Sequence, residues 1–137
     1  FIEVKNRQFS FPKSERLHSK IKINRLFTDG KSFIVYPLKI FYNFEPSEEF
    51  NVCILISVPK KQFKKAIHRN RIKRLLRETY RLNKHLIFEK FSQRKFQIQL
   101  AFVYVANEEI DFYKLNEKMK IALQKLIELV DHDKESY

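Results

Sequence analysis

The segment from about Ala66 to Phe88 constrains the fold more than any other part of the chain, because it has the period of a two-sided helix. At about 100° per residue, its charged side chains fall on one side of the helix and its apolar side chains on the opposite side. The charged side, called the ridge below, contains Arg69, Asn70, Lys73, Arg74, Arg77, Arg81 and Lys84, and the apolar side contains Ile72, Leu75, Leu76, Thr79, Leu82 and Leu86. The apolar side therefore has to pack on other elements, and the ridge faces outward.

Three apolar segments are predicted to form the sheet on which this helix packs. Residues 32–44 are rich in aromatic and β-branched side chains and form one strand or two, with Pro37 at an edge or a strand entry. Residues 50–58 form another strand that is apolar enough to be central. Residues 97–106 alternate between polar and apolar and then become continuously apolar, which predicts a third strand region.

Two further helices are predicted at the two ends of this pattern. Ser14 caps the first helix, whose loose apolar stripe ends near Gly30. Gly30 is the only glycine in the chain, and its position predicts a left-handed C-cap. Asp111 caps the last helix, which has apolar residues at i, i+3 and i+4 up to Val130.

The order of elements is therefore α-β-β-α-β-α, with the first strand region possibly split. This order predicts an α+β fold, a single layer sandwich in which helices pack on a small central sheet. The length of 137 residues favours one domain over residues 1–137. Within it, we expect residues 1–13 to form a basic N-terminal arm and residues 131–137 to form a frayed tail.

The charge of the chain predicts a polyanionic partner. The formal net charge is +12 and the pI is about 9.8, and a surplus of that size repels itself unless an anion balances it. Between Arg69 and Lys84 only Glu78 interrupts the positive charge. Arginine prevails there, and its planar guanidinium binds phosphate oxygens in pairs, which favours nucleic acid.

A membrane surface is the second candidate for an anionic partner, but a membrane-bound helix needs its apolar side free for lipid, and here the sheet needs that side. The longest apolar stretches are far shorter than the roughly 20 residues of a membrane span. A single cysteine, Cys53, lies in a strand pattern, so we expect a buried thiol and no disulfide framework. We therefore predict no membrane partner and a cytoplasmic location.

The acidic and histidine residues do not form the pattern of a protein nuclease. The carboxylates fall in expected turns, a helix cap and the tail, and the four histidines have no zinc-like spacing. Glu78 is expected to pair with Arg74, one turn away. We therefore predict no catalytic residue and no metal site within the protein itself.

The residues RNRIKRLLRE at 69–78, preceded by SVPKKQFKKAIH, closely resemble the signature of the bacterial ribonuclease P protein subunit. The resemblance extends from RLHSKIKINRLFTDG to the last helix. It implies the fold of the second domain of ribosomal protein S5, with a left-handed βαβ crossover, which is rare. It also implies a protein that partners a catalytic RNA, which holds Mg²⁺ and removes the 5′ leader of precursor tRNA.

The resemblance also implies which residues bind RNA. The signature positions that face the RNA subunit or the precursor are Arg69, Asn70, Arg71, Lys73, Arg74 and Arg77. Lysines of the connector before the helix add charge toward RNA: Lys60, Lys61, Lys64 and Lys65. The residues that match the lining of the leader cleft are Ile23, Phe27, Lys39 and Phe41.

The residues by themselves leave some of these roles open. Asn70 is suited to a base edge, to a 2′-hydroxyl or to capping the local backbone. Phe27 is suited to stacking on an unpaired base or to ordinary packing. The chain departs from the family where Leu55 replaces a common glycine, where Ile23 replaces a common aromatic residue and in the connector, which is one residue longer. Two other functions stay possible from the sequence, namely a general RNA-binding module and a self-sufficient metal nuclease.

Overall fold

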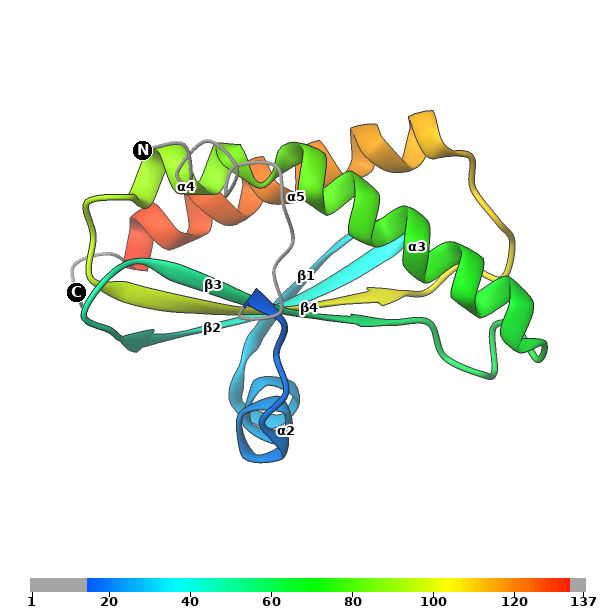
Figure 1. The fold of residues 1–137 in the computed structure, drawn as a ribbon, viewed down its shortest axis with the longest axis horizontal. Coiled ribbons are helices and arrows are strands. Elements are labelled where there is room, and N and C mark those ends of the chain that lie inside the picture. Colours follow the sequence, from blue (N-terminus) through cyan, green and yellow to red (C-terminus); the bar gives the residue numbers. More distant parts are fainter. Residues whose placement is uncertain (1–14, 134–137) are drawn as a thin grey trace.

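The computed structural model describes residues 15–133, so the predicted arm lies outside the described residues. A four-stranded sheet forms the middle layer, with three helices on one face and one helix on the other (Figure 1). The strands are β1 (Lys31–Val35), β2 (Leu38–Pro46), β3 (Asn51–Ser57) and β4 (Phe96–Tyr104). The helices are α2 (Lys20–Asp29), α3 (Ala66–Asn83), α4 (His85–Phe91) and α5 (Phe112–Asp133). The predicted α+β class and order of elements are confirmed.

The sheet has the order β1-β2-β4-β3, and its first predicted strand region is split in two. A turn at Tyr36 and Pro37 separates β1 from β2, and these two strands pair as an antiparallel hairpin. β4 lies between β2, which is antiparallel to it, and β3, which is parallel to it. Two parallel neighbours need a crossover, which α3 and α4 supply. The left hand of that crossover stays an expectation from the family.

The larger core lies between the sheet and the layer of α3, α4 and α5. Alternate residues of the strands point into it, including Leu38 and Ile40 of β2 and Val52 and Ile54 of β3, all at most 2% exposed. This alternation is the period of two that a strand imposes on its side chains. Five aromatic rings, those of Phe44, Phe50, Phe88, Phe91 and Phe96, contact one another at the end of the sheet near α4.

A smaller cluster lies on the opposite face of the sheet, under α2. It consists of Leu17, Leu26 and Ala101, with Ile23, Phe41, Cys53 and Leu55 packed around them. Cys53 is only half-buried, and that burial raises the pKa of its thiol. The helix is also held by an ion pair of 2.7 Å between Lys22 Nζ and Glu45 Oε1 of β2. This face is covered by one short helix, so part of it stays accessible.

The start of the first helix differs from the prediction. Ser14 lies outside the described residues, and the N-cap of α2 is Ser19, whose hydroxyl accepts a hydrogen bond from the backbone N–H of Lys22 at 3.3 Å. Residues before Ser19 are not part of α2, because Arg16 pairs with Ile54 in a short parallel bridge beside β3. This segment therefore pairs with the edge of the sheet through a single bridge.

The prediction of a left-handed cap at Gly30 is wrong. Its backbone is extended, with φ −72° and ψ 158°. Glycine is needed there for space, because a Cβ would meet the carbonyl oxygen of Leu26 and would lie 3.1 Å from that of Tyr42. The glycine is explained chiefly by the carbonyl of Leu26 in the last turn of α2, and in addition by that of Tyr42 in β2.

The long basic helix ends earlier than predicted. α3 stops at Asn83, and α4 runs in a new direction from His85 to Phe91 (Figure 1). At the break, the amide of Asn83 donates to the carbonyl of Thr79 and to Asn116 of α5. At the other end of the chain, α5 continues to Asp133, so helix replaces the first three residues of the predicted tail. Residues 134–137 lie outside the described range.

Candidate nucleic-acid interface

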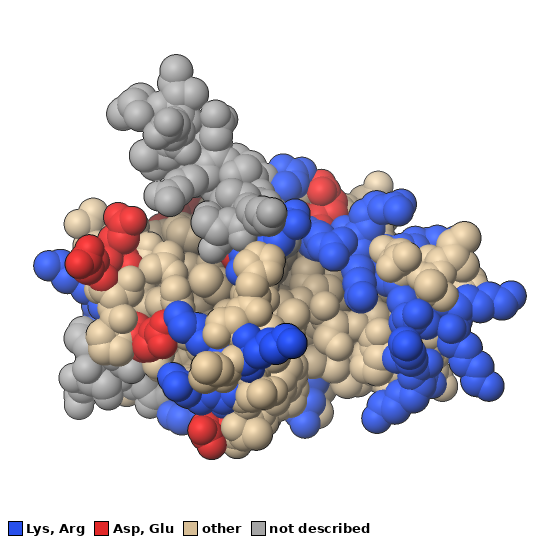
Figure 2. Space-filling view, turned by 60° about the horizontal axis from the view of Figure 1, so that its bottom comes forward, with Lys and Arg blue, Asp and Glu red and all other residues tan. Residues whose placement is uncertain are grey.

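The two sides of α3 separate as the sequence predicts. Ile72, Leu76 and Thr79 are buried against the sheet and α5, and Asn70, Arg74 and Arg77 are exposed. Figure 2 shows Lys and Arg side chains crowded where the connector and α3 begin, and a second group over α2 on the same face. The first half of α3 therefore presents most of its charge outward.

The ridge ends before Lys84, so that part of the prediction is wrong. Lys84 has no exposed surface, and its Nζ lies 2.9 and 3.0 Å from the two carboxylate oxygens of Glu15. It also lies 5.5 Å from the centre of the Phe88 ring. A buried charge needs such partners, because desolvation of an unpaired ammonium costs several kcal/mol. The break between α3 and α4 turns this side chain inward.

The predicted pair between Glu78 and Arg74 is also wrong. Glu78 accepts instead from Arg81, with Nε at 3.2 Å from Oε2. This hydrogen bond holds the pKa of the Glu78 carboxyl below its usual range and raises the pKa of Arg81. Arg74 and Arg81 both lie within one turn of Glu78, so their spacing in the sequence does not decide which of them pairs with it. Arg74 is therefore left unpaired among residues 15–133.

Arg69, the first signature residue, contacts the backbone of the connector. Its Nη1 donates to the carbonyl oxygens of Phe63 and Lys64, both at 2.8 Å. Arg69 is half-buried in this position. The guanidinium thus fixes the end of the connector that carries Lys64 and Lys65, both of which are exposed.

Arg71 and His68 contact an acidic residue that the sequence analysis assigned to the cap region before the last helix. Glu109, in the loop between β4 and α5, accepts two hydrogen bonds of 3.1 Å from Nη1 of Arg71. The Nδ1 of His68 lies 3.4 Å from the same carboxylate. Glu109 thus offsets charge at the start of α3. The only signal for it in the sequence is its position just after a strand, which does not identify the helix that it reaches.

Four of the six signature residues remain available for a ligand: Asn70, Lys73, Arg74 and Arg77. None of their side chains forms a hydrogen bond or ion pair with any residue between 15 and 133. The capping role considered for Asn70 is therefore not seen in the described chain. The connector adds Lys60, Lys61, Lys64 and Lys65, which are all exposed. These side chains form a cationic surface along the connector and α3, and Figure 2 shows Lys and Arg gathered where the connector and α3 begin.

The residues that match the leader cleft lie together on the face of the sheet that carries α2. The rings of Phe27 and Phe41 contact edge to face, with centroids 4.8 Å apart. The Nζ of Lys39 lies 5.0 Å from the centre of the Phe41 ring. Ile23 packs beside Phe41 on the smaller cluster. Phe27 is 38% exposed, so it both packs and offers an accessible ring.

In residues 15–133, no three His, Cys, Asp or Glu side chains are grouped so that they could hold a metal ion. Within the same range, no helix is both long and apolar enough to cross a membrane. What the site offers is positive charge and accessible aromatic rings.

The chain is similar in sequence to known ribonuclease P proteins. A family model described as Ribonuclease P matches residues 11–127. The ribonuclease P protein component of Porphyromonas gingivalis W83 is 42% identical over 118 residues, which cover 84% of this chain and 85% of that protein. The ribonuclease P protein component of Chlorobaculum tepidum is 32% identical over 108 residues, 73% of this chain and 70% of that protein.

The fold comparison gives the same result. The solved ribonuclease P protein of Thermotoga maritima superposes with a TM-score of 0.60 at 27% identity, covering 81% of this chain and 96% of that one. The chain therefore belongs to the family of bacterial ribonuclease P protein components, which act in tRNA processing as part of a ribonucleoprotein.

Proposed function

We propose that this chain binds the RNA subunit of ribonuclease P through the cationic surface at the start of α3, and the 5′ leader of precursor tRNA through the cleft beside α2. In this function the RNA subunit, with Mg²⁺ held mainly by RNA, hydrolyses the precursor in the cytoplasm. The protein contributes affinity and position and takes no part in bond breaking.

One observation carries the leader assignment. Phe27, Phe41 and Lys39 form a continuous series of ring, ring and ammonium on a sheet face that a single short helix covers. Aromatic rings bind unpaired bases of any sequence, at about 1–3 kcal/mol per stacked base. An ammonium beside them suits the phosphate that links two such bases. A structured duplex presents no free base faces, so the cleft favours a single strand.

The cationic surface suits the larger RNA. Lys73, Arg74 and Arg77 have no partner within residues 15–133, so they can bind phosphate without first breaking an internal ion pair. Asn70 lies among them and carries both a donor and an acceptor, which suits a base edge or a 2′-hydroxyl. Lys and Arg side chains over α2 and at the start of α3 lie on one face of the molecule, so one RNA assembly can contact both groups (Figure 2).

The test compares affinity for precursor tRNA with and without its 5′ leader, in the presence of the RNA subunit. We expect the leader to strengthen binding of the wild type and Phe41→Ala to remove that gain. Thermal unfolding of Phe41→Ala is the control, since the ring also packs on the smaller cluster. If the leader makes no difference to the wild type, the cleft assignment is wrong and a general RNA-binding module is the better description.

A further inference from the structure

Helix α2 is attached to the sheet by fewer buried side chains than the long basic helix on the other face. Leu26 is the single buried residue of α2, whereas α3 buries five. The ring of Phe27 also contacts that of Phe41. Lys22 and Glu45 form an ion pair, but their side chains are 38% and 29% exposed. Because the free energy of local opening falls as buried contacts become fewer, α2 should open more readily than α3.

The sequence of α2 is a weak helix former. Its ten residues are fewer than the roughly 12–15 that an isolated helix needs in water. Lys20 and Lys22 lie at its N-terminal end and Asp29 lies at its C-terminal end, which is the unfavourable arrangement for the helix dipole. The hydroxyl of Thr28 donates to the carbonyl of Asn24 at 2.8 Å, a side-chain bond of the kind that slightly destabilises helices. The helix therefore depends on the sheet for its conformation.

Both ends of α2 are tied to the sheet by short connections. At the C-terminal end, Gly30 alone separates the helix from β1. At the N-terminal end, the preceding segment is anchored on β3 by the bridge between Arg16 and Ile54. The backbone N–H of Leu17 donates to the carbonyl of Ile54 there, at 2.7 Å. These two anchors lie outside α2, so they do not require the helix itself to stay on the sheet.

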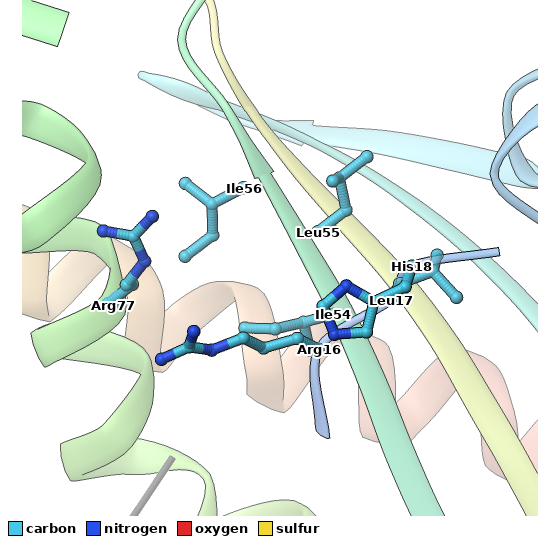
Figure 3. Close-up of a pocket in the computed structure, with 7 residues that line it drawn as sticks. All are labelled: Arg16, Leu17, His18, Ile54, Leu55, Ile56 and Arg77. Atoms are coloured by element: carbon cyan, nitrogen blue, oxygen red, sulfur yellow. The ribbon is translucent and has the colours of Figure 1, made fainter. Parts of the chain in front are cut away.

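The N-terminal anchor borders a cavity of about 190 Å³, which lies between it and α3. Arg16 and His18 line the cavity from the anchor, and Arg77 lines it from α3. Figure 3 shows the guanidinium ends of Arg16 and Arg77 on the side nearest α3, with Leu55 and Ile56 extending from β3. Because a void deprives the side chains around it of van der Waals contacts, packing against α3 does little to fix this anchor.

The sheet is held together without α2. The ladders of β2 with β1 and β4, and of β4 with β3, lie within the sheet. The larger core closes the opposite face. Loss of α2 uncovers Phe41, Ala101 and Leu55 of the smaller cluster, which contains far fewer buried side chains than the larger core. The remaining elements can therefore stay folded while α2 opens.

We propose that α2 is a lid, which opens from the sheet while the other elements stay folded and closes when the leader lies against Phe27 and Phe41. The ion pair between Lys22 and Glu45 holds the lid closed, and its loss widens the cleft. A bound phosphate near Lys20 and Lys22 offsets the unfavourable charge at the N-terminal end of the helix and so favours the closed state. The closing step rests on the proposed function, whereas the opening step is a property of the free protein.

The experiment measures amide hydrogen exchange of the full chain by mass spectrometry and compares peptides that cover α2 with peptides that cover β4. Rates are divided by the intrinsic exchange rates, so that they report opening of the structure. We expect α2 to exchange at least about tenfold faster than β4, because local opening needs less free energy than global unfolding. Low urea should accelerate exchange of β4 and leave that of α2 nearly unchanged, since opening one short helix exposes little surface.

Four variants separate local opening from global unfolding. Ile98→Val trims a fully buried side chain of β4 and should accelerate exchange of β4 about two- to twelvefold without changing that of α2. Glu45→Gln should accelerate exchange of α2 by a factor of about 1.4 to 5. Its control, Glu48→Gln, removes the same charge from an exposed position after β2 and should change neither. Asn24→Ala should slow exchange of α2 about threefold, because alanine is the better helix former.

The lid is overturned if α2 and β4 exchange at the same rate, or if Ile98→Val accelerates both, because α2 then opens only when the whole protein unfolds. A second measurement adds the RNA subunit and precursor tRNA with or without its leader, and we expect the leader to slow exchange of α2. A leader that strengthens binding and leaves exchange of α2 unchanged also overturns the lid. A leader that does not strengthen binding contradicts the proposed function instead, and the variants still decide whether α2 opens in the free protein.

Discussion

The two faces of the sheet differ most clearly along β4. Toward α3, α4 and α5 this strand presents Ile98, Leu100, Phe102 and Tyr104, which have no exposed surface. Toward α2 it presents Gln97, Gln99, Ala101 and Val103, which are smaller or polar. The first face is closed by three helices and the second by one (Figure 1). One strand thus separates the residues that stabilise the fold from those that leave room for a ligand.

The largest expected effect distinguishes an aromatic residue of the closed face from one of the open face. Phe102→Ala should lower the free energy of unfolding by about 3–5 kcal/mol, because it leaves a cavity in the core. Phe27→Ala should cost about 1 kcal/mol, mainly its contact with Phe41. Urea unfolding measures both. Equal losses would show that the α2 face is as much a part of the core as the other.

The second prediction concerns Lys84, which was predicted to lie on the ridge and is buried in the structure. Lys84→Met should destabilise the protein by about 3 kcal/mol, because it leaves the carboxylate of Glu15 buried without its partner. The double variant with Glu15→Leu should recover most of that loss. Arg74→Ala on the exposed ridge is the matched control and should change stability by less than about 0.5 kcal/mol. A single variant as stable as the wild type would refute the buried pair.

The third prediction separates the signature residues that position others from those that contact RNA directly. Arg69→Ala and Lys64→Ala should be non-additive in their effect on RNA affinity, with a coupling of at least about 0.5 kcal/mol, since Arg69 fixes the backbone of Lys64. Arg74→Ala and Lys64→Ala should be additive. Additivity in both cycles would mean that Arg69 acts on RNA independently of the connector.

A smaller effect is expected at Glu109, which offsets the charge of Arg71. Glu109→Gln should raise RNA affinity by a factor of about 1.4 to 5, the range of about 0.2–1 kcal/mol typical of an exposed ion pair. The gain should shrink as salt is added. The control is Glu108→Gln, because the neighbouring Glu108 forms no ion pair with the described residues. A loss of affinity would mean that Glu109 orients Arg71 for RNA.

The smallest effect near neutral pH belongs to Tyr104 on the closed face. Burial raises the pKa of its phenol from 10.0 to about 12. Because the folded pKa lies above the unfolded one, the contribution of Tyr104 to stability is constant below about pH 10 and falls between pH 10 and about 12. Tyr104→Phe should reduce that fall in unfolding experiments, and the buried Tyr80, whose pKa burial also raises, should account for a further part of it. Tyr113→Phe, at an 81% exposed position, should leave it unchanged.

The helical period was enough to predict which side of α3 packs and which faces out, because Ile72, Leu76 and Arg77 obey local geometry. Local geometry does not reach Lys84, whose partner Glu15 lies 69 residues away. For the same reason the sequence did not predict the contact of Glu109 with α3, which forms only when the chain is folded. At Glu78 two arginines lie at suitable spacing, so the period leaves the choice open. Gly30 was predicted to end the first helix, but the steric reason for a glycine is seen only in the structure: a Cβ would meet the carbonyl oxygen of Leu26 and crowd that of Tyr42.

The cleft residues were found by resemblance and not by pattern. Phe27 and Phe41 come from a helix and a strand whose approach depends on Gly30 and on the ion pair between Lys22 and Glu45. In the sequence they look like ordinary core residues. Nothing in the sequence predicted the bridge between Arg16 and β3, since it joins residues that are far apart in the chain.

The position of β4 has a consequence for how the protein is made. β4 is the last strand in the sequence, yet it lies between β2 and β3 and joins them. Until Phe96–Tyr104 has left the ribosome, we expect the nascent chain to hold only the β1–β2 hairpin and isolated helices. At a synthesis rate of about 5–20 residues per second, β2 and β3 lack the strand that joins them for several seconds. During that interval the basic helix is already exposed, so cellular RNA can meet it before the sheet exists.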